Sequence, residues 1–418
     1  MRRGVLIGLV LALGSWCMAA DWPRWRGPDG TGHVPAGAAV PQALPAEPKV
    51  NWHVKVGDGL ASPVVCGGRV FHLDHQQGKE TVHAADAASG KELWSVALDE
   101  VFKDGQSVPG PRCTPVADGD RVYVQSCRGE FQCLGAADGK VIWRANFVKD
   151  FGAVFIGESG DATGASRHGY NGSAVVDGDR IIVGAGGTSG ASVVCLDKRT
   201  GAVIWKSQND IPGYSGPVLA TIAGTRQVVS FTSEAVIGLD AADGRLLWRF
   251  PVKTSLGRHV TTPVVVDDIV VVASHQAGLI GIRVSKQGDA FQAAQAWVAR
   301  GLAINFSSPV AVGPYLYGLG PANSLFCADV RTGQKAWLQA GFFADMLDRG
   351  YASLLVMGGN LLVLAENGQA MLVAADPKEC RIISKTRVCG KNLCNPAYAD
   401  GHLVVRDTGE LRSVQLMP

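Results

Sequence analysis

The spacing Asp-x-x-x-Gly-x-x-x-Trp recurs along this chain, and it constrains the fold more than any other feature of the sequence. In "LDAADGRLLWRF" it is formed by Asp240, Gly244 and Trp248. It returns as Asp86, Gly90 and Trp94, as Asp197, Gly201 and Trp205, and as Asp329, Gly333 and Trp337. In "CLGAADGKVIW" Gly135 stands at the Asp position, with Gly139 and Trp143 in place. Self-similarity at intervals of a few tens of residues is typical of solenoids and propellers.

A second phrase recurs upstream of each Trp, as in "TPVADGDRVYVQ" and "TPVVVDDIVVVA". Each phrase predicts a short strand, a tight turn at Gly or Asp, and a second strand rich in β-branched residues. A third strand, the Asp-x-x-x-Gly turn and a fourth strand that carries the Trp complete the unit. Four strands joined in this way make one blade of a β-propeller.

The spacing has a physical reason within such a blade. The Asp carboxylate can accept hydrogen bonds from the backbone N–H groups of the turn, and the Gly supplies a positive φ at little cost. The Trp begins the outermost strand, where its ring can fill the widening gap between blades. Because one blade cannot satisfy its own faces, blades stack into a ring.

The number of blades follows from the turns. Six turns end near Trp94, Trp143, Trp205, Trp248, Trp297 and Trp337, and a degenerate seventh lies in "AADPKECRIIS". The remaining "CNPAYADGHLVVRDTGELRSVQLM" contains three strands, and "PKVNWHVKV" near the other end supplies a fourth with Trp52. The sequence therefore predicts an all-β, eight-bladed β-propeller of four-stranded antiparallel blades over residues 49–418. Its last blade is closed by the N-terminal strand around Trp52, which removes the open edges of the ring.

The segments before the propeller have their own signals. Residues 1–20 are expected to be a signal peptide, because Arg2 and Arg3 precede the short apolar run "VLIGLVLAL" and small residues near Ala20. That run is too short to span a bilayer, and the mature chain contains no longer one. Trp16 before Cys17 argues against a lipid anchor. We expect a periplasmic or secreted protein, with residues 21–48 as an extended N-terminal arm on the outside of the ring.

Charge and cysteine content narrow the classes of partner. The formal net charge is +2, and removal of Arg2 and Arg3 brings it near zero. A neutral chain argues against nucleic acid as a partner. Cys127 with Cys133, and Cys389 with Cys394, are close enough in sequence to form bridges, whereas the third-strand positions Cys133, Cys195 and Cys327 are typical of small buried hydrophobic residues.

Candidate binding residues gather where loops enter the innermost strands, because these loops open around the central channel on one face of a propeller. The candidates are Arg112, His168, Tyr170, Asn171, Tyr214, Arg258, His259, Asn305, Arg349 and Asn392, with Tyr351 and Lys391 beside them. They predict a channel-mouth site for a small anionic ligand or an acidic peptide. The alternative is that these loops are polar because they are solvated.

Other patterns carry less chemistry. His72 and Asp74 share a face of a strand and form a candidate metal pair, although a polar strand end explains them equally well. The chain has no G-x-S-x-G nucleophile elbow. No catalytic residue is assigned.

These repeats, together with the opening "DWPRWRGPDGTG", resemble the pyrroloquinoline-quinone-like (PQQ-like) propeller family from about Asp21 to the end of the chain. That family includes secreted bacterial repeat proteins, BamB and quinoprotein alcohol dehydrogenases. Its enzyme branch implies PQQ with calcium as cofactor and a disulfide between adjacent cysteines. This chain has no Cys-Cys pair, and its sequence shows no recognisable calcium-ligand motif.

We therefore expect a non-catalytic binding or scaffold propeller of the bacterial cell envelope, with a protein or a small anionic ligand at the channel mouth. One alternative is a PQQ- and calcium-dependent oxidoreductase that acts on an alcohol or sugar. Another is a BamB-like outer-membrane protein assembly factor. The sequence leaves the partner, the binding of PQQ and the oligomeric state open, and it is compatible with a monomer.

Overall fold

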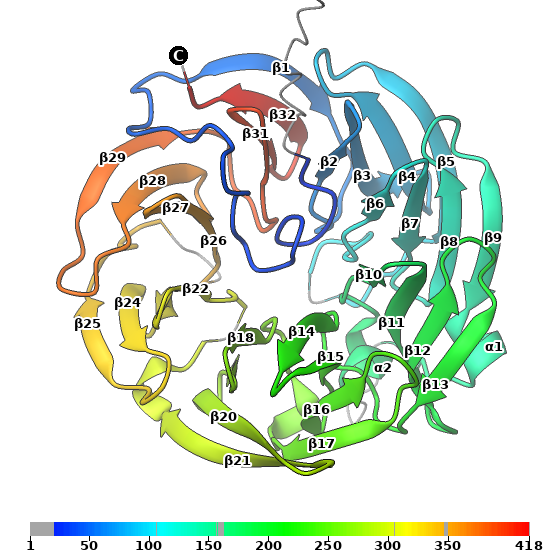
Figure 1. Ribbon diagram of the computed structural model, residues 1–418. Coiled ribbons are helices and arrows are strands. Elements are labelled where there is room, and N and C mark those ends of the chain that lie inside the picture. Colours follow the sequence, from blue (N-terminus) through cyan, green and yellow to red (C-terminus); the bar gives the residue numbers. More distant parts are fainter. Residues whose placement is uncertain are drawn as a thin grey trace, which may run out of the picture.

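The computed structural model describes residues 21–105, 107–155, 157, 163–304, 306–346 and 350–417. The strands of these residues form eight four-stranded antiparallel sheets, arranged radially as the blades of a ring (Figure 1). The prediction of an all-β, eight-bladed propeller is confirmed.

The first four blades follow one another along the chain, each written here from its innermost to its outermost strand. Blade 1 contains β2 (Val64–Cys66), β3 (Arg69–Gln76), β4 (Lys79–Asp86) and β5 (Glu92–Glu100). Blade 2 contains β6 (Val116–Asp118), β7 (Arg121–Gln125), β8 (Glu130–Gly135) and β9 (Val141–Asn146). Blade 3 contains β10 (Val175–Asp177), β11 (Arg180–Gly187), β12 (Ala191–Asp197) and β13 (Val203–Ser207). Blade 4 contains β14 (Val218–Ile222), β15 (Thr225–Phe231), β16 (Ala235–Asp240) and β17 (Leu246–Pro251).

The other four blades repeat this order, and the last one draws on both ends of the described chain. Blade 5 contains β18 (Val264–Val266), β19 (Ile269–Ser274), β20 (Gly278–Gln287) and β21 (Ala290–Ala299). Blade 6 contains β22 (Val310–Val312), β23 (Tyr315–Gly320), β24 (Ser324–Asp329) and β25 (Lys335–Gln339). Blade 7 contains β26 (Ala352–Met357), β27 (Asn360–Ala365), β28 (Gln369–Ala374) and β29 (Ile382–Arg387). Blade 8 contains β30 (Ala397–Ala399), β31 (His402–Arg406), β32 (Glu410–Gln415) and, as its outermost strand, β1 (Lys49–Lys55).

The helices are short and lie in loops between blades. They are α1 (Phe147–Phe151), α2 (Ala165–His168), η1 (Ser255–Gly257) and η2 (Arg300–Leu302). No helix of the described residues combines the length and the apolar character that crossing a membrane requires.

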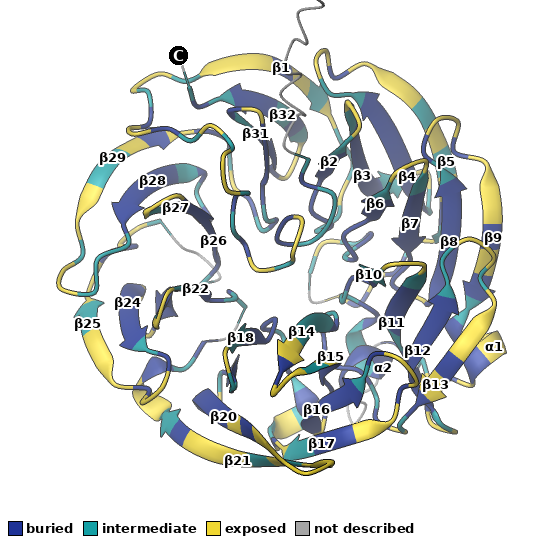
Figure 2. Ribbon diagram, viewed as in Figure 1, coloured by how far each residue is buried: buried dark blue, intermediate teal, exposed yellow. Residues whose placement is uncertain are grey.

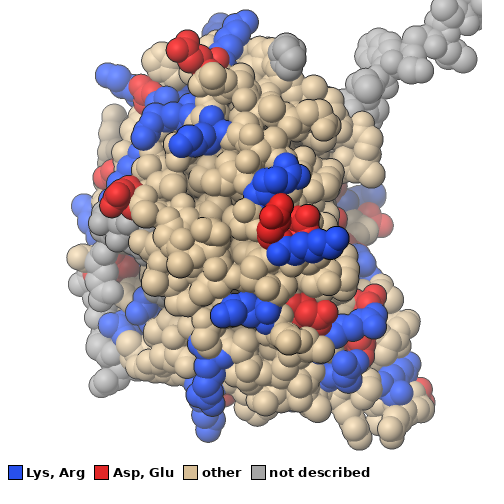
Figure 3. Space-filling model, turned by 90° about the vertical axis from the view of Figure 1, so that its left-hand side faces the viewer, with Lys and Arg blue, Asp and Glu red and all other residues tan. Residues whose placement is uncertain are grey.

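The core lies between the blades rather than in one central layer. Figure 2 shows the middle strands largely buried and the outermost strands alternately exposed. The strand cysteines Cys133, Cys195 and Cys327 are buried in this core, and the nine described cysteines are all free thiols. The outer rim that carries β25 and β29 shows Lys and Arg intermixed with Asp and Glu (Figure 3).

The recurring turns have the predicted chemistry. Asp197 Oδ1 accepts hydrogen bonds from the backbone N–H groups of Arg199 (2.9 Å) and Thr200 (2.8 Å). Gly201 has φ 74° and donates its N–H to the Asp197 carbonyl oxygen at 2.9 Å. The carboxylate and the positive φ together fix this turn, as the spacing indicated.

Blade 8 joins to blade 1 through side chains as well as strands. In β1, Trp52 pairs with Ser413 of β32, and its Nε1 donates to the Ala87 carbonyl oxygen of blade 1 at 2.8 Å. The buried Arg406 guanidinium of blade 8 donates to the carbonyl oxygen of Leu73 in blade 1 and to that of Gly57 in the loop from β1 to β2. These contacts make the last junction of the ring as continuous as the others.

Hydroxyl groups at the strand entries link neighbouring blades around the channel. Each accepts a hydrogen bond from a backbone N–H of the adjacent blade: Ser62 from Asn395 (2.9 Å), Thr114 from Ser62 (3.3 Å), Ser173 from Thr114 (3.0 Å), Ser308 from Thr262 (2.9 Å) and Ser307 from Ala352 (3.0 Å). The Ser and Thr residues at these entries therefore fix the channel wall.

The sequence predicts that residues 21–48 form an arm on the outside of the ring, but part of this arm runs into the ring. Figure 1 shows this arm, in dark blue, running inward to the centre of the ring before it returns towards β29 and β1. Its backbone pairs with β2 at Trp22 and Val65, and with β26 at His33 and Val356. The arm enters on the face that carries the Asp-x-x-x-Gly turns, because Asp21 accepts a hydrogen bond from Gly67 in the turn between β2 and β3. We call this the turn face, and the opposite face, with the loops between blades, the loop face.

Candidate functional site

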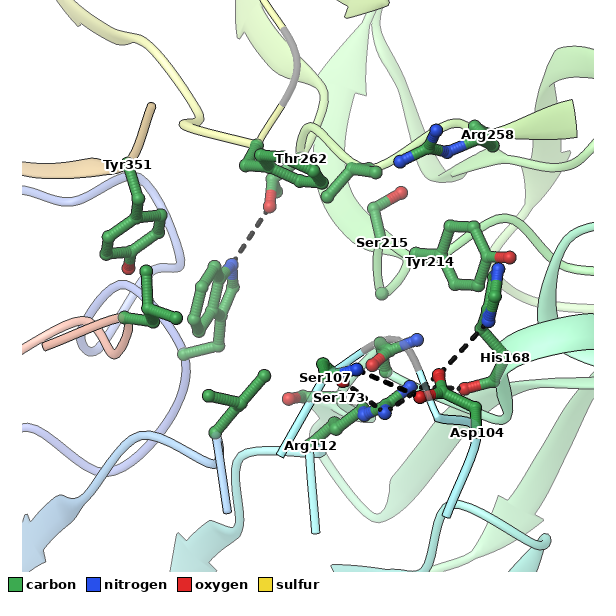
Figure 4. Close-up of a pocket in the computed structure, with 17 residues that line it drawn as sticks. Asp104, Ser107, Arg112, His168, Ser173, Tyr214, Ser215, Arg258, Thr262 and Tyr351 are labelled. Atoms are coloured by element: carbon green, nitrogen blue, oxygen red, sulfur yellow. Dashed lines mark hydrogen bonds and ion pairs between the residues drawn. The ribbon is translucent and has the colours of Figure 1, made fainter. Parts of the chain in front are cut away.

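A cavity of about 310 Å³ lies in the channel, where the loops of several blades enter their innermost strands (Figure 4). Such a volume is near the lower end of typical small-ligand sites. The residues that line it are Trp25, Leu60, Asp104, Ser107, Arg112, His168, Asn171, Ser173, Tyr214, Ser215, Gly216, Arg258, Val260, Thr262, Phe306, Tyr351 and Leu393.

The arm forms one side of the cavity. The indole Nε1 of Trp25 donates to the Thr262 hydroxyl at 2.9 Å, just before β18. The neighbouring Arg26 is buried and donates to the Pro309 carbonyl oxygen at 2.7 Å. Burial lowers the pKa of Arg26 to about 10, so its guanidinium remains charged at neutral pH. The arm therefore occupies the turn-face side of the channel and leaves the cavity to the loop face.

Arg112 belongs to a tight polar cluster on one wall. Its Nη2 donates to Asp104 Oδ2 at 3.0 Å and to the Ser107 hydroxyl at 2.6 Å, and its Nη1 donates to the His168 carbonyl oxygen at 2.7 Å. Its guanidinium also lies 5.1 Å from the centroid of the Phe102 ring. Because the Asp104 carboxylate is buried beside it, the charge of Arg112 is compensated within the protein.

His168 lies next to this pair and shares its carboxylate. Its Nδ1 is 3.1 Å from Asp104 Oδ2. Burial lowers the pKa of His168, and the attraction of Asp104 only partly offsets that effect. The imidazole is therefore neutral at pH 7, and its Nδ1–H donates to the carboxylate.

A second group of donors has no such compensation. Arg258 is half-buried, lies 6.0 Å from the centroid of the Phe306 ring, and forms no ion pair within the described part of the chain. The buried hydroxyl groups of Tyr214 and Ser215 also have no hydrogen-bond partner among the described residues. Burial raises the pKa of Tyr214 to about 12, so this hydroxyl keeps its proton and remains a donor. Figure 4 shows Arg258, Ser215 and Tyr214 together on one side of the cavity.

Much of the remaining lining is apolar. Leu60, Phe306, Tyr351 and Leu393 contribute to it together with Trp25. The Tyr351 hydroxyl is bound to the Ser353 hydroxyl at 2.9 Å and to the Asn395 side-chain amide at 3.1 Å. Its ring is thus held in place while its polar end is satisfied by the protein.

The structure brings five of the ten candidate binding residues together around the cavity. Arg112, His168, Asn171, Tyr214 and Arg258 line the cavity, and so does the neighbouring Tyr351. Asn305 and Arg349 lie outside the described residues.

Three selected residues are buried away from the cavity with partners of their own. Tyr170 donates to the Ala185 carbonyl oxygen at 2.7 Å, and the Asn392 side chain donates to the Ala365 carbonyl oxygen at 3.2 Å. His259 Nδ1 donates to the Thr232 carbonyl oxygen at 2.6 Å. These contacts hold the loops that carry the cavity residues.

Sequence reasoning missed several lining residues. Asp104, Ser107 and Phe306 gave no signal, because nothing in the chain marks which loop residues meet. Trp25 stands in the motif "DWPRWRG" of the arm, which by itself indicates no binding site. Its place in the cavity follows from the path of the arm through the channel, which no local pattern reveals.

The candidate metal pair has a different role. Asp74 Oδ1 is bound to His83 Nε2 at 2.9 Å, and Asp74 Oδ2 accepts from the Gly57 N–H at 2.7 Å. Burial acts to raise the pKa of Asp74, but these hydrogen bonds outweigh it and hold the pKa well below its usual range. His72 stacks on His83 with ring centroids 4.7 Å apart. Among the described residues, no group of three or more His, Cys, Asp or Glu side chains is placed to hold a metal ion.

Comparison with known proteins places the chain in a family. The family model described as outer membrane protein assembly factor BamB matches residues 78–339. This chain belongs to the BamB family. It is 24% identical over 372 residues to BamB of Yersinia pestis, and the alignment covers 86% of this chain and 76% of that protein. It is 30% identical over 106 residues to BamB of Escherichia coli K12, and this alignment covers 23% of this chain and 26% of that protein.

Solved structures agree on the fold. BamB from Moraxella catarrhalis superposes with a TM-score of 0.57 at 17% identity, over 87% of this chain and 98% of that one. The quinohemoprotein alcohol dehydrogenase from Comamonas testosteroni superposes with a TM-score of 0.62 at 13% identity, over 94% of this chain and 80% of that one. At these identities the likeness concerns the fold and not the activity.

The structural likeness to a quinohemoprotein raises the question of whether the residues of this cavity could hold PQQ with calcium. Calcium takes about six to eight oxygen ligands, with carboxylates prominent among them. Asp104 is the one carboxylate among the described lining residues, and its Oδ2 is already bound by Arg112 and His168. The residues of this cavity therefore do not fit a calcium–quinone pair.

Proposed function

We propose that this protein is a non-catalytic binding propeller of the cell envelope, exported to the periplasm, whose ligand or partner docks at the loop face of the channel. The observation that carries this proposal is the Arg258 guanidinium, which forms no ion pair among the described residues and lines a cavity together with Tyr214 and Ser215, whose buried hydroxyls have no partner among those residues. A buried donor without a partner costs stability, so its presence in a cavity favours a bound ligand that accepts its hydrogen bonds. Membership in a family of envelope assembly factors supports a binding role rather than a chemical one.

The scaffold suits that role. The loops around the cavity are held by contacts between blades, such as the one from the Thr262 N–H to the Ser308 hydroxyl at 2.9 Å. The arm fills the turn-face side of the channel, with Trp25 bound to Thr262. A rigid site that is approached from one face loses little conformational entropy on binding.

The proposal is tested with matched arginine variants. Arg258→Met removes the uncompensated charge on the loop face. Arg245→Met removes an exposed charge on the turn face, where Arg245 pairs with Asp240 at 3.4 Å. The tagged mature protein and both variants are cross-linked in the envelope fraction of the source organism, and the products are quantified by mass spectrometry.

We expect the specific cross-linked product to fall at least about tenfold with Arg258→Met, as loss of a charge-assisted contact implies, and to persist with Arg245→Met. Equal yields from the two variants, or the reverse order, would place the contact elsewhere and refute docking at the loop face.

A second candidate function is a BamB-like role in the assembly of outer-membrane proteins. The observation that favours it is the family match over residues 78–339, together with the alignment to Yersinia pestis BamB over 86% of this chain. Deletion of the gene in the source organism should then lower the amount of outer-membrane barrel proteins, and expression of the wild-type chain should restore it. Unchanged barrel proteins in the deletion strain would exclude this role and leave the general binding propeller.

A further inference from the structure

We propose that the cavity binds a monoanionic carboxylate with an apolar body, its carboxylate on Arg258 and its apolar body against Trp25. This inference rests on the proposed function and names the chemical class of ligand. It depends on the balance of charge in the cavity, the arrangement of donors, and the apolar residues of the lining.

The charge balance sets the number of negative charges. Two arginines line the cavity, but Arg112 is bound to Asp104 at 3.0 Å, and this pair is neutral as a whole. His168 is neutral at pH 7 because burial lowers its pKa. Arg258 therefore supplies the one uncompensated charge among the described lining residues. A ligand with one negative charge balances it, whereas a further anionic group would find no second uncompensated cation among the described lining residues.

The donors around Arg258 match the shape of a carboxylate. A guanidinium offers two parallel N–H groups to the two oxygens of a carboxylate, which have further lone pairs free. Tyr214 and Ser215 line the cavity with Arg258, and their buried hydroxyls have no partner among the described residues. They can donate to those lone pairs once their side chains shift towards the ligand. A carboxylate at this position would pair with Arg258, which forms no ion pair among the described residues, and would offer acceptors to the two unpartnered hydroxyls.

The apolar part of the lining sets the body of the ligand. Trp25, Leu60, Phe306, Tyr351 and Leu393 present aromatic and aliphatic surface to the cavity. Aromatic side chains favour an aromatic or planar apolar group, and a volume of about 310 Å³ limits it to a small one. Sugars and simple alcohols would leave this surface without a matching partner.

The path of the chain sets the orientation of the ligand. Arg258 follows η1 in a loop of the loop face, whereas Trp25 reaches Thr262 at the entry of β18 from the arm. The charged end of the ligand therefore lies nearer the loop face and the apolar end lies deeper. Two sources share this chemistry: a free small carboxylic acid, and the C-terminal carboxylate of a partner chain that ends in an apolar residue.

Calorimetric titration of the mature protein tests the inference with defined probes. The probes are N-acetylphenylalanine, its uncharged amide, an acetylated hexapeptide that ends in phenylalanine with a free carboxylate, and citrate. The acid should bind at least about tenfold more tightly than the amide, and more tightly than the trianionic citrate. Arg258→Met should abolish the preference for the acid, whereas Arg245→Met should preserve it. Tighter binding of the hexapeptide than of N-acetylphenylalanine points to a partner chain as the source, and the reverse points to a free acid.

Several results would overturn the inference. They are equal binding of acid and amide, tighter binding of citrate, or no binding of either acid probe at millimolar concentration to protein that circular dichroism shows to be folded. These failures are separable from failure of the proposed function. If cross-linking still depends on Arg258 while no probe binds, the loop-face site stands and the ligand class is wrong.

Discussion

Trp205 of blade 3 lies directly against Gly244 of blade 4, so that a Cβ added to Gly244 would stand 2.5 Å from the indole Cε3. The Trp205 Nε1 also donates to the Ala241 carbonyl oxygen in the same turn, at 3.3 Å. Equivalent close approaches join Trp52 to Gly90, Trp94 to Gly139, Trp143 to Gly201 and Trp297 to Gly333. The Gly of the repeat thus serves two needs, since it takes a positive φ and leaves room for the Trp of the preceding blade.

Substitution of this glycine should cost more than its backbone conformation explains. Gly244→Ala should lower the free energy of unfolding by about 3 to 5 kcal/mol, because the added methyl group must displace the Trp205 ring. Gly224→Ala is the matched control: Gly224 has φ 74°, close to the 75° of Gly244, but no atom lies within 4 Å of its added Cβ. Its cost should be about 1 to 2 kcal/mol, the price of the left-handed conformation alone.

Chemical denaturation of the two variants measures the difference. A loss at Gly244 that is no larger than the loss at Gly224 would show that the ring moves freely, and that the spacing reflects the turn alone.

The repeat pattern predicts the local features of each blade but not the contacts between blades. Asp, Gly and Trp positions follow from turn chemistry and strand order, which are local, and the structure has them as expected. The partner of each Trp is not local, because it belongs to the next blade. Trp248 shows the limit: its Nε1 donates to Gln227 Oε1 of its own blade at 2.6 Å. Blade 5 has the longer hairpin of β20 and β21 in place of the Asp-x-x-x-Gly turn. Trp248 of blade 4 therefore lacks the turn carbonyl oxygen that accepts from the other Trp side chains.

The sequence predicts which loops form the candidate site, but not which of their side chains face the cavity. Arg258 lines the cavity while the adjacent His259 is buried behind it, and Asn171 lines it while Tyr170 does not. Successive residues of an extended segment point to opposite sides, so neighbours cannot both face the channel. A single sequence does not reveal which of the two does so.

The junction that closes the ring gives a second prediction. Ser62→Ala should lower the free energy of unfolding by about 1 to 3 kcal/mol, because it leaves the Asn395 N–H without its acceptor at 2.9 Å. Ser285→Ala, at an exposed position of β20, should change it by less than about 0.5 kcal/mol. Urea denaturation followed by circular dichroism compares the two. Equal and negligible effects would show that a water molecule replaces the hydroxyl at the junction.

The buried His259 predicts a pH dependence. It is 0% exposed, stacks on Phe231, and has its Nδ1 and Nε2 occupied by Thr232 and Thr254. Burial lowers its pKa from about 6.5 to about 4. The unfolded chain therefore takes up a proton before the folded chain does, and stability falls as the pH drops from about 6.5 to about 4. The contribution of this one group is about 3 kcal/mol at most.

His259→Gln tests that dependence, because glutamine keeps a donor and an acceptor but does not titrate. The variant should lose less stability than the wild type between pH about 6.5 and about 4, although His72, whose pKa burial lowers to about 3, keeps part of the slope in both. Thermal unfolding across this pH range is the measurement. Parallel profiles for the two proteins would mean that His259 is protonated in the folded state without penalty.

The arm gives the last prediction, which concerns the closure of the channel. Trp22 is 2% exposed, and its backbone exchanges hydrogen bonds with Val65 of β2 at 2.8 and 2.9 Å. Trp22→Ala removes the side chain that holds the arm on the turn face, with an expected loss of about 3 to 5 kcal/mol in the stability of that segment. Arg26, now buried in the channel, should then become accessible to trypsin. Native-state proteolysis should show cleavage after Arg26 at least about a hundredfold faster than in the wild type, since the segment opens more often by the corresponding free energy. Val50→Ala, at an exposed position of β1, should leave the rate unchanged. An unchanged rate in Trp22→Ala would mean that the contacts of Trp25 and Arg26 alone keep the arm in the channel.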